Sequence, residues 1–189
     1  MIDQILEYDT KLFLFLNNLG SPVWDNFWLF VTNRFAFIPL YIFLFYLLYK
    51  KYGLKALLVF AIVVTLMITF TDQITNVFKR GFARPRPCGV AELTDQIRFV
   101  VDYCGKYGFF SGHSSNTMAV AVFAGLLLKP YYKYLIFILL FWSATVAYSR
   151  IYVGVHYPLD IVCGLTFGAF SGFLFYKVAK YLLTKLKHD

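Results

Sequence analysis

The sequence predicts an all-α fold, a polytopic transmembrane helical bundle of five or six spans. Hydrophobic residues make up 60% of the 189 residues and charged residues only 15%, and the mean hydropathy of +0.64 is high for a water-soluble domain. The apolar runs are long and lack the alternation of a membrane β-barrel strand. Because lipid offers no hydrogen bonds to the backbone, such runs are expected to be helical.

Five apolar segments are the expected helices of this bundle, with bounds uncertain by a few residues. They are Phe35–Tyr49, Leu54–Phe78, Thr117–Leu128, Tyr134–Tyr148 and Leu159–Leu183. Several are shorter than the roughly 20 residues that span a bilayer, and flanking Tyr and Trp side chains at headgroup level extend them. Since no linker or internal repeat divides the chain, we expect one membrane-embedded domain over residues 1–189.

Residues 1–33 form an N-terminal amphipathic region ahead of these segments. Ile2–Leu19 mixes apolar and polar residues, which fits either a helix in the membrane interface or a short first span. Acidic residues stand where a secretory signal carries positive charge, namely Asp3, Glu7 and Asp9. The N-terminus is therefore expected to be retained.

Lysine clusters predict the orientation of the bundle. They fall in three regions: Lys50, Lys51 and Lys55; Lys129 and Lys133; and Lys177, Lys180, Lys185 and Lys187. Positive residues collect on the cytoplasmic side, so an outer loop at 79–115 and the segment 149–160 are expected together on the outer face. The net charge of +8 forms no single continuous patch, which favours a phospholipid bilayer as partner and argues against nucleic acid.

Two cysteines, Cys88 and Cys104, lie in the predicted outer loop, whereas Cys163 lies in an apolar segment. In an oxidising compartment the first two would form a disulfide that stabilises the loop by about 3 kcal/mol. The alternative is a pair of free thiols.

Two polar clusters in the outer loop are suited to bind phosphate. KRGFARPRP, from Lys79 to Pro87, places four cations at the end of a membrane helix, where they need anionic partners. By itself this run also fits a patch that attracts anionic headgroups. FFSGHSSNT contains Ser111, Gly112 and His113 at the start of an apolar helix, where free backbone N–H groups bind anions and a histidine exchanges protons. A lone histidine there is more often a cap or surface residue.

The third cluster is SRIYVGVHYPLD, from Ser149 to Asp160. If a helix begins near Pro158, His156 and Asp160 project from one face. A carboxylate on one imidazole nitrogen leaves the other free as a nucleophile. Taken alone, such a pair is usually a helix contact, but three polar clusters on one membrane face predict a functional site.

In these three clusters the sequence resembles the type 2 phosphatidic acid phosphatase family, which is related to the vanadium haloperoxidase fold. The family motifs match Lys79 with Arg86-Pro87, then Ser111-Gly112-His113, then Ser149-Arg150 with His156 and Asp160. The resemblance runs from about Leu54 to the tail. Phe110 stands where the family usually has proline.

The resemblance implies a metal-independent lipid phosphatase without a cofactor. His156 would attack phosphorus to give a phosphohistidine, Asp160 would orient His156, and His113 would protonate the leaving oxygen and then activate water. The phosphoryl oxygens would be held by Lys79, Arg86, Ser111, Gly112 and Arg150. The residues themselves show no cluster with metal-ligand spacing.

Three polar residues fall outside the motifs. Arg80 and Arg84 are expected to face water, and the alternatives are contacts with lipid headgroups or with a second phosphate. Asp72 lies on a polar helical stripe that leads to Lys79, so it is either a supporting residue of the site or a polar contact inside the bundle.

The expected substrate is a phosphate or pyrophosphate on a membrane lipid. Undecaprenyl pyrophosphate, phosphatidylglycerol phosphate, phosphatidic acid and lipid A phosphates all fit the motifs. The alternatives are a lipid phosphotransferase with an alcohol acceptor and, outside enzymes, a lipid transporter. We expect a bacterial inner membrane protein with its site on the periplasmic face, and the sequence leaves its oligomeric state open.

Overall fold

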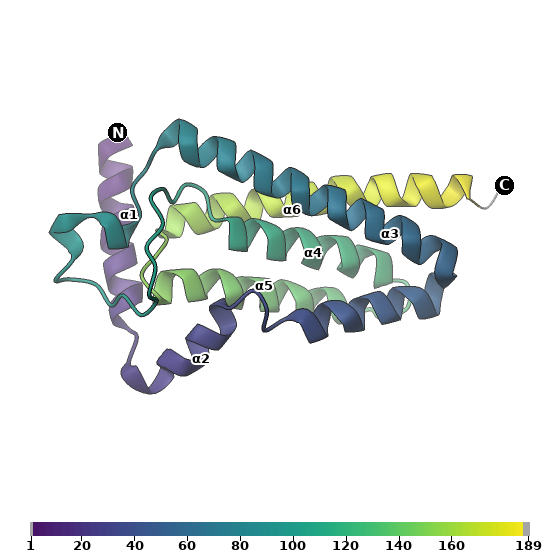
Figure 1. Cartoon of the computed structure of the whole chain (residues 1–189), viewed down its shortest axis with the longest axis horizontal. Coiled ribbons are helices and arrows are strands. Elements are labelled where there is room, and N and C mark those ends of the chain that lie inside the picture. The colour runs from purple at the N-terminus through teal and green to yellow at the C-terminus, as the bar shows by residue number, and fades with distance from the viewer. Residues whose placement is uncertain (1, 187–189) are drawn as a thin grey trace.

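The computed structural model describes residues 2–186. Met1 and residues 187–189, including Lys187 of the basic tail, lie outside the described residues. Figure 1 shows a bundle of long, roughly parallel rods with a short helix across one end. The helices are α1 (Ile2–Asn18), α2 (Pro22–Thr32), α3 (Ile38–Phe82), α4 (Gly112–Leu128), α5 (Leu135–Tyr152) and α6 (Pro158–Lys185).

The bundle confirms the predicted all-α membrane fold. Helix α3 reverses direction at Gly53, whose φ of 79° and ψ of 177° are not helical, so it forms two arms joined by a sharp bend (Figure 1). A positive φ combined with a ψ near 180° is readily adopted only by glycine. The two arms with α4, α5 and α6 make five rods. By length and composition alone, three helices within residues 2–186 are long and apolar enough to cross a membrane: α3, α5 and α6.

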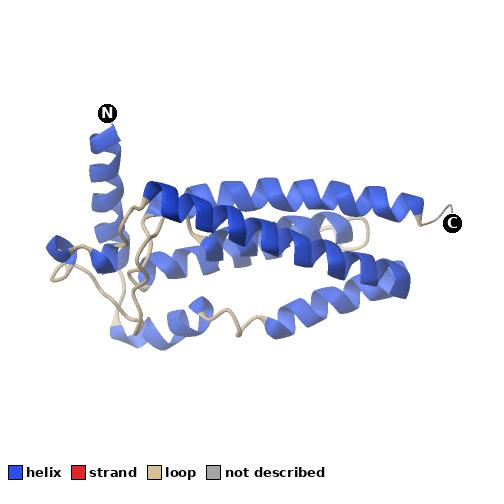
Figure 2. Ribbon diagram, turned by 45° about the horizontal axis from the view of Figure 1, so that its top comes forward, coloured by secondary structure: helices blue, strands red, loops and turns tan. Residues whose placement is uncertain are grey.

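Helices α1 and α2 do not extend the bundle. Helix α1 crosses the end of the rods at a steep angle, as both ribbon views show (Figures 1 and 2), and this favours the interfacial alternative for the N-terminal region. One side of α1 packs on the bundle through Asp9, Phe13 and Asn17. Another side leaves large apolar residues exposed, as expected for a helix in the headgroup layer: Ile5, Tyr8, Leu12 and Phe15.

The predicted helix bounds differ from the structure mainly at α4. The apolar pattern predicted a start at Thr117, whereas α4 starts at Gly112 because Ser111 caps it, accepting a hydrogen bond from the backbone N–H of Ser114. The first turn of α4 is polar, so hydropathy did not reveal it. The bend at Gly53, the α4–α5 turn and the end of α6 lie at one end of the rods, and the polar motifs lie at the other (Figure 1).

Helices α4 and α6 pack closely through three glycines of α6. A Cβ on Gly164 would lie 2.7 Å from the carbonyl oxygen of Ser111, one on Gly172 would lie 2.5 Å from that of Ala119, and one on Gly168 would overlap that of Ser115. Small residues at four-residue spacing allow membrane helices to approach in this way. This contact fixes α6, which carries Asp160, against α4, which carries His113.

Replacing Gly168 with valine is expected to lower the stability of the protein by about 1–3 kcal/mol, because the added side chain forces α4 and α6 apart. Thermal unfolding in detergent measures the change. Gly81→Ala is the matched control, since a Cβ there meets nothing within 4 Å. Equal melting temperatures for the two variants would show that the glycine contact does not hold these helices together.

Candidate active site

The predicted nucleophile lies in a tight turn between α5 and α6. Gly154, with φ of 84°, allows the chain to reverse after α5, and the backbone N–H of His156 donates to the carbonyl of Arg150 at 3.2 Å. Helix α6 begins at Pro158, as predicted from the proline. The imidazole Nδ1 of His156 then lies 3.1 Å from Oδ2 of Asp160.

The environment of His156 keeps its ring neutral. The residue is only 2% exposed, and burial, together with the nearby cations Arg86, Arg150 and Lys79, lowers the pKa of His156 well below its ordinary value. A neutral ring that donates from Nδ1 to a carboxylate has its Nε2 lone pair free. The geometry therefore leaves an uncharged ring nitrogen that is shielded from bulk water.

Motif two is attached directly to motif three. The backbone N–H of Ser111 donates to the carbonyl oxygen of Asp160 at 3.0 Å. The hydroxyl of Ser111 accepts from the hydroxyl of Ser114 at 3.0 Å, which leaves its own proton for another acceptor. Gly112 faces Lys79, since a Cβ on it would lie 3.7 Å from the lysine Nζ. Phe110 is buried against the rings of Phe78 and Phe167.

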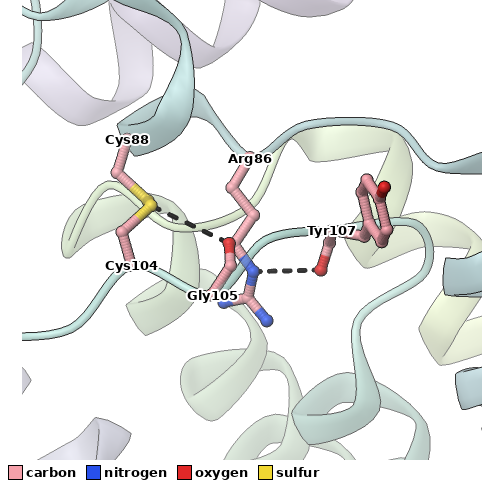
Figure 3. The surroundings of a disulfide bond; sticks show 5 residues. All are labelled: Arg86, Cys88, Cys104, Gly105 and Tyr107. Atoms are coloured by element: carbon pink, nitrogen blue, oxygen red, sulfur yellow. Dashed lines mark hydrogen bonds between the residues drawn. A yellow bond between two sulfur atoms is a disulfide. The ribbon is translucent and has the colours of Figure 1, made fainter.

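Arg86 is held by Gly105 and Tyr107, near the end of the outer loop. Its Nε donates to the carbonyl oxygen of Tyr107 at 3.1 Å, and its guanidinium lies against Gly105, where a Cβ would come within 3.1 Å of Cζ. Figure 3 shows this contact beside the disulfide between Cys88 and Cys104. The disulfide thus ties together the two stretches of loop that position Arg86.

The double variant Cys88→Ser with Cys104→Ser is expected to be less stable by about 3 kcal/mol, because the open loop has more conformational freedom when unfolded. We also expect a raised KM, since the loop around Arg86 loosens. Thermal unfolding and kinetics in detergent measure both. Cys163→Ser, at the free cysteine in α6, is the control. Unchanged melting of the wild type in reductant would contradict this prediction.

Arg150 is a buried cation that lacks an anionic partner among residues 2–186. Its NH1 donates to the hydroxyl of Thr32, at the end of α2, while its Nε is buried and has no hydrogen-bond partner in the same part of the chain. Within residues 2–186 no carboxylate lies within 4.0 Å of Lys79, Arg86 or Arg150. Their charges all act on both His113 and His156. The structure therefore brings three unpaired cations and two imidazoles to one end of the bundle.

Asp72 lies near this group but forms no ion pair with a cation of residues 2–186. Its carboxylate accepts from the side-chain amide of Asn116 at 2.7 Å, and Asn116 accepts from the hydroxyl of Thr71 at 2.5 Å. These residues connect α3 to α4 beside Lys79. Asn116 was not among the residues expected at the site, although its place one helical turn after His113 puts it on the same face of α4.

Arg84 was expected to face water, and this expectation was wrong. Its side chain is 15% exposed and forms ion pairs with Asp9 and Asp160. Arg80 is exposed, as expected. In α1, Asp9, Phe13 and Asn17 recur every four residues and form the buried face. This spacing indicates that Asp9 is buried, but it does not identify Arg84 as its partner.

A cavity of about 580 Å³ runs from this site into the bundle. Its polar end is lined by Lys79, His113, Asp72 and Asn116, and its apolar part includes the following residues of α3 and α4: Tyr41, Leu44, Leu48, Val64, Ile68 and Phe123. The volume is typical of small-ligand sites. A molecule with a phosphate at one end and hydrocarbon at the other matches this distribution of polar and apolar walls.

Comparison with known proteins agrees with the three motifs. The model of the PAP2 superfamily matches residues 57–183. The chain belongs to this superfamily. Members of the PAP2 superfamily similar to this chain are lipid phosphatases, so the chain is a membrane-embedded lipid phosphatase.

Two curated relatives are each named lipid A 4'-phosphatase. The protein of Bacteroides thetaiotaomicron is 34% identical over 192 residues, which cover 100% of this chain and 84% of the relative. The protein of Porphyromonas gingivalis is 37% identical over 186 residues, which cover 95% of this chain and 76% of the relative. Both likenesses include the N-terminal region that lies outside the family match.

Two crystal structures have the same fold. LpxE of Aquifex aeolicus has a TM-score of 0.69 at 26% identity, covering 89% of this chain and 94% of LpxE. The PAP2 type phosphatidylglycerolphosphate phosphatase of Bacillus subtilis has a TM-score of 0.75 at 19% identity, covering 94% of this chain and 87% of that one. The second likeness extends to the fold alone.

Proposed function

We propose that residues 1–189 form one membrane-embedded domain that removes a phosphate from lipid A through a phosphohistidine at His156. The observation that carries this proposal is the neutral, buried imidazole of His156, paired with Asp160 and surrounded by three cations that lack carboxylate partners within residues 2–186. A buried cation without an anion is costly. A phosphoryl group supplies the missing negative charge.

The proposed reaction has two steps. Nε2 of His156 forms a bond to phosphorus while the bond from phosphorus to the lipid oxygen breaks, and His113 gives that oxygen a proton. His113 then takes a proton from water, which attacks the phosphohistidine and releases inorganic phosphate. Lys79, Arg86 and Arg150, with the Ser111 hydroxyl and the Gly112 amide, stabilise the charge on the phosphoryl oxygens in both steps.

One observation favours lipid A over other lipid phosphates: both relatives that cover nearly the whole chain are named lipid A 4'-phosphatase. The cavity beside Lys79 and His113 extends between α3 and α4, where a hydrocarbon chain has room. It supports a lipid substrate and does not distinguish lipid A from the other lipids.

We further propose a bacterial inner membrane location with the site on the periplasmic face. The disulfide and the phosphate-binding motifs lie at one end of the bundle, and the lysine-rich turns lie at the other (Figure 1). Positive residues favour the cytoplasmic side, and disulfides persist in the periplasm.

The test is release of inorganic phosphate by the purified protein, measured with malachite green. The substrates are bis-phosphorylated lipid A, undecaprenyl pyrophosphate, phosphatidylglycerol phosphate and phosphatidic acid, each in the same detergent. We expect the highest kcat/KM with lipid A, and mass spectrometry of the product should locate the loss at the 4' position. Vanadate should inhibit, and EDTA should have no effect.

The outcomes separate the two parts of the proposal. A higher kcat/KM with one of the other three lipids would overturn the substrate and leave the lipid phosphatase reaction intact. Turnover without an acid-labile, alkali-stable phosphoryl label on the protein would overturn the phosphohistidine.

A further inference from the structure

Arg84 connects the His156 and Asp160 pair to the N-terminal helix. Its NH1 donates to Oδ1 of Asp160 at 3.2 Å, and its NH2 donates to Oδ2 of Asp9 at 2.7 Å. The guanidinium also lies over the ring of Tyr157, 3.9 Å from the centroid. One guanidinium therefore joins two buried carboxylates, one from α1 and one from α6.

The carboxylate of Asp160 is held by three donors. Oδ2 interacts with Nδ1 of His156 and accepts from the backbone N–H of Tyr157, each at 3.1 Å, and Oδ1 accepts from Arg84. Among residues 2–186, Arg84 is the one Lys or Arg side chain within 4.0 Å of Asp160. Since Asp160 is 0% exposed, its charge depends on that cation.

Asp9 holds Arg84 in this position. Its Oδ1 accepts from the backbone N–H of Leu159, in the first turn of α6, at 2.8 Å. Its Oδ2 accepts from NH2 of the Arg84 guanidinium. Arg84 is thus fixed on the Asp160 side, although it stands only two residues before the phosphate-binding candidate Arg86. A planar guanidinium whose NH1 and NH2 are both bound to carboxylates has little freedom to turn towards a phosphate.

A second contact of α1, through Asn17, attaches this helix to the other side of the turn that carries His156. The side-chain amide of Asn17 donates to the carbonyl oxygens of Ile151 and Tyr152 at the end of α5, at 3.0 and 2.9 Å. Asp9 and Asn17 lie two helical turns apart on the buried face of α1. They therefore attach this helix to both ends of the turn that carries His156.

We propose that Asp9 and Arg84 are positioning residues, which hold Asp160 in the orientation that fixes the ring of His156. Helix α1 then contributes a positioning residue to the active site, in addition to lying in the membrane interface. This inference rests on the proposed nucleophilic role of His156. Loss of a group that orients a histidine ligand in metal sites lowers activity about 10- to 100-fold, and we expect an effect of this order on kcat.

The test compares Arg84→Gln, Arg84→Lys, Asp9→Asn and the double variant Asp9→Asn with Arg84→Gln. Arg84→Gln should lower kcat about 10- to 100-fold with KM unchanged, because Arg84 does not touch the substrate. Arg84→Lys should recover part of the loss. Asp9→Asn keeps an oxygen for the Leu159 N–H but loses the charge facing Arg84, so it should lower kcat by a smaller factor.

The double variant decides whether Asp9 acts through Arg84. If it does, the double variant is no slower than Arg84→Gln alone, because the interaction is already lost. Glu7→Gln is the control, since Glu7 lies on the same helix in an exposed ion pair with Lys11, and its kcat should be unchanged.

Three results would overturn the proposal: wild-type kcat in folded Arg84→Gln or Asp9→Asn, a raised KM at wild-type kcat, or losses that multiply in the double variant. The second result would instead place Arg84 on the substrate. If Arg84→Gln does not fold, Arg84→Lys and Asp9→Asn still answer the question, and wild-type kcat in both would refute positioning. Wild-type phosphate release and its phosphoryl label are measured alongside, so failure of the proposed function is seen separately.

Discussion

Replacing His156 with asparagine is expected to lower lipid phosphate release by at least about 10³-fold, which corresponds to about 4 kcal/mol of transition-state stabilisation. Asparagine retains a hydrogen-bonding group near Asp160 but has no nitrogen lone pair able to attack phosphorus. Release of inorganic phosphate under single-turnover conditions measures the loss. The same samples, quenched in alkali, should carry no phosphoryl label.

His113→Gln is the matched histidine variant for this experiment. With p-nitrophenyl phosphate, whose leaving group needs little help from an acid, the variant should still form the phosphohistidine but hydrolyse it slowly, since His113 activates water in the proposed mechanism. The label should therefore accumulate in His113→Gln and be absent in His156→Asn. The reverse pattern would exchange the two roles. Labelling of a folded His156→Asn protein would remove His156 as the nucleophile.

Arg150→Met should lower kcat/KM about 10²- to 10³-fold, because the guanidinium stabilises charge that develops on the phosphoryl oxygens. The same substitution should leave the melting temperature unchanged or raise it. Within residues 2–186 Arg150 has no carboxylate partner, and its Nε is buried without a hydrogen bond. An apolar side chain of similar length removes that desolvation cost.

Arg80→Gln serves as the control for Arg150, because Arg80 is an exposed arginine close to the motifs. Its activity should stay within about twofold of the wild type, as is usual for a solvated charge. Parallel activity assays and thermal unfolding of the two variants complete the comparison. A large drop in melting temperature for Arg150→Met, with activity retained, would make Arg150 a structural residue.

Local sequence was sufficient to predict the helices and the spacing of the motifs. The long apolar segments predicted α3, α5 and α6, because in lipid a backbone satisfies its hydrogen bonds most simply within a helix. Pro158 predicted the start of α6, and the four-residue spacing placed His156 and Asp160 within reach of each other. The bend between the two arms of α3 was also expected, since the apolar run is interrupted between Tyr49 and Leu54.

Contacts between distant residues were beyond sequence reasoning. Asp9 and Arg84 are 75 positions apart, and nothing in the pattern around either residue indicates the other. The same holds for Thr32 and Arg150, which are separated by 118 positions. An arginine in a basic run is equally compatible with exposure to water, contact with headgroups or a buried ion pair. Only the folded structure therefore shows what surrounds it.

The sequence by itself therefore determined the membrane environment, the helical architecture and the three family motifs, because these depend on hydropathy, periodicity and residue type along short stretches. Only the tertiary structure decided that α1 crosses the end of the bundle and that Asp9 reaches Arg84 and the first turn of α6. It also decided which cations are paired. Charge pairing depends on distances between side chains in space, and the order of residues along the chain does not give these distances.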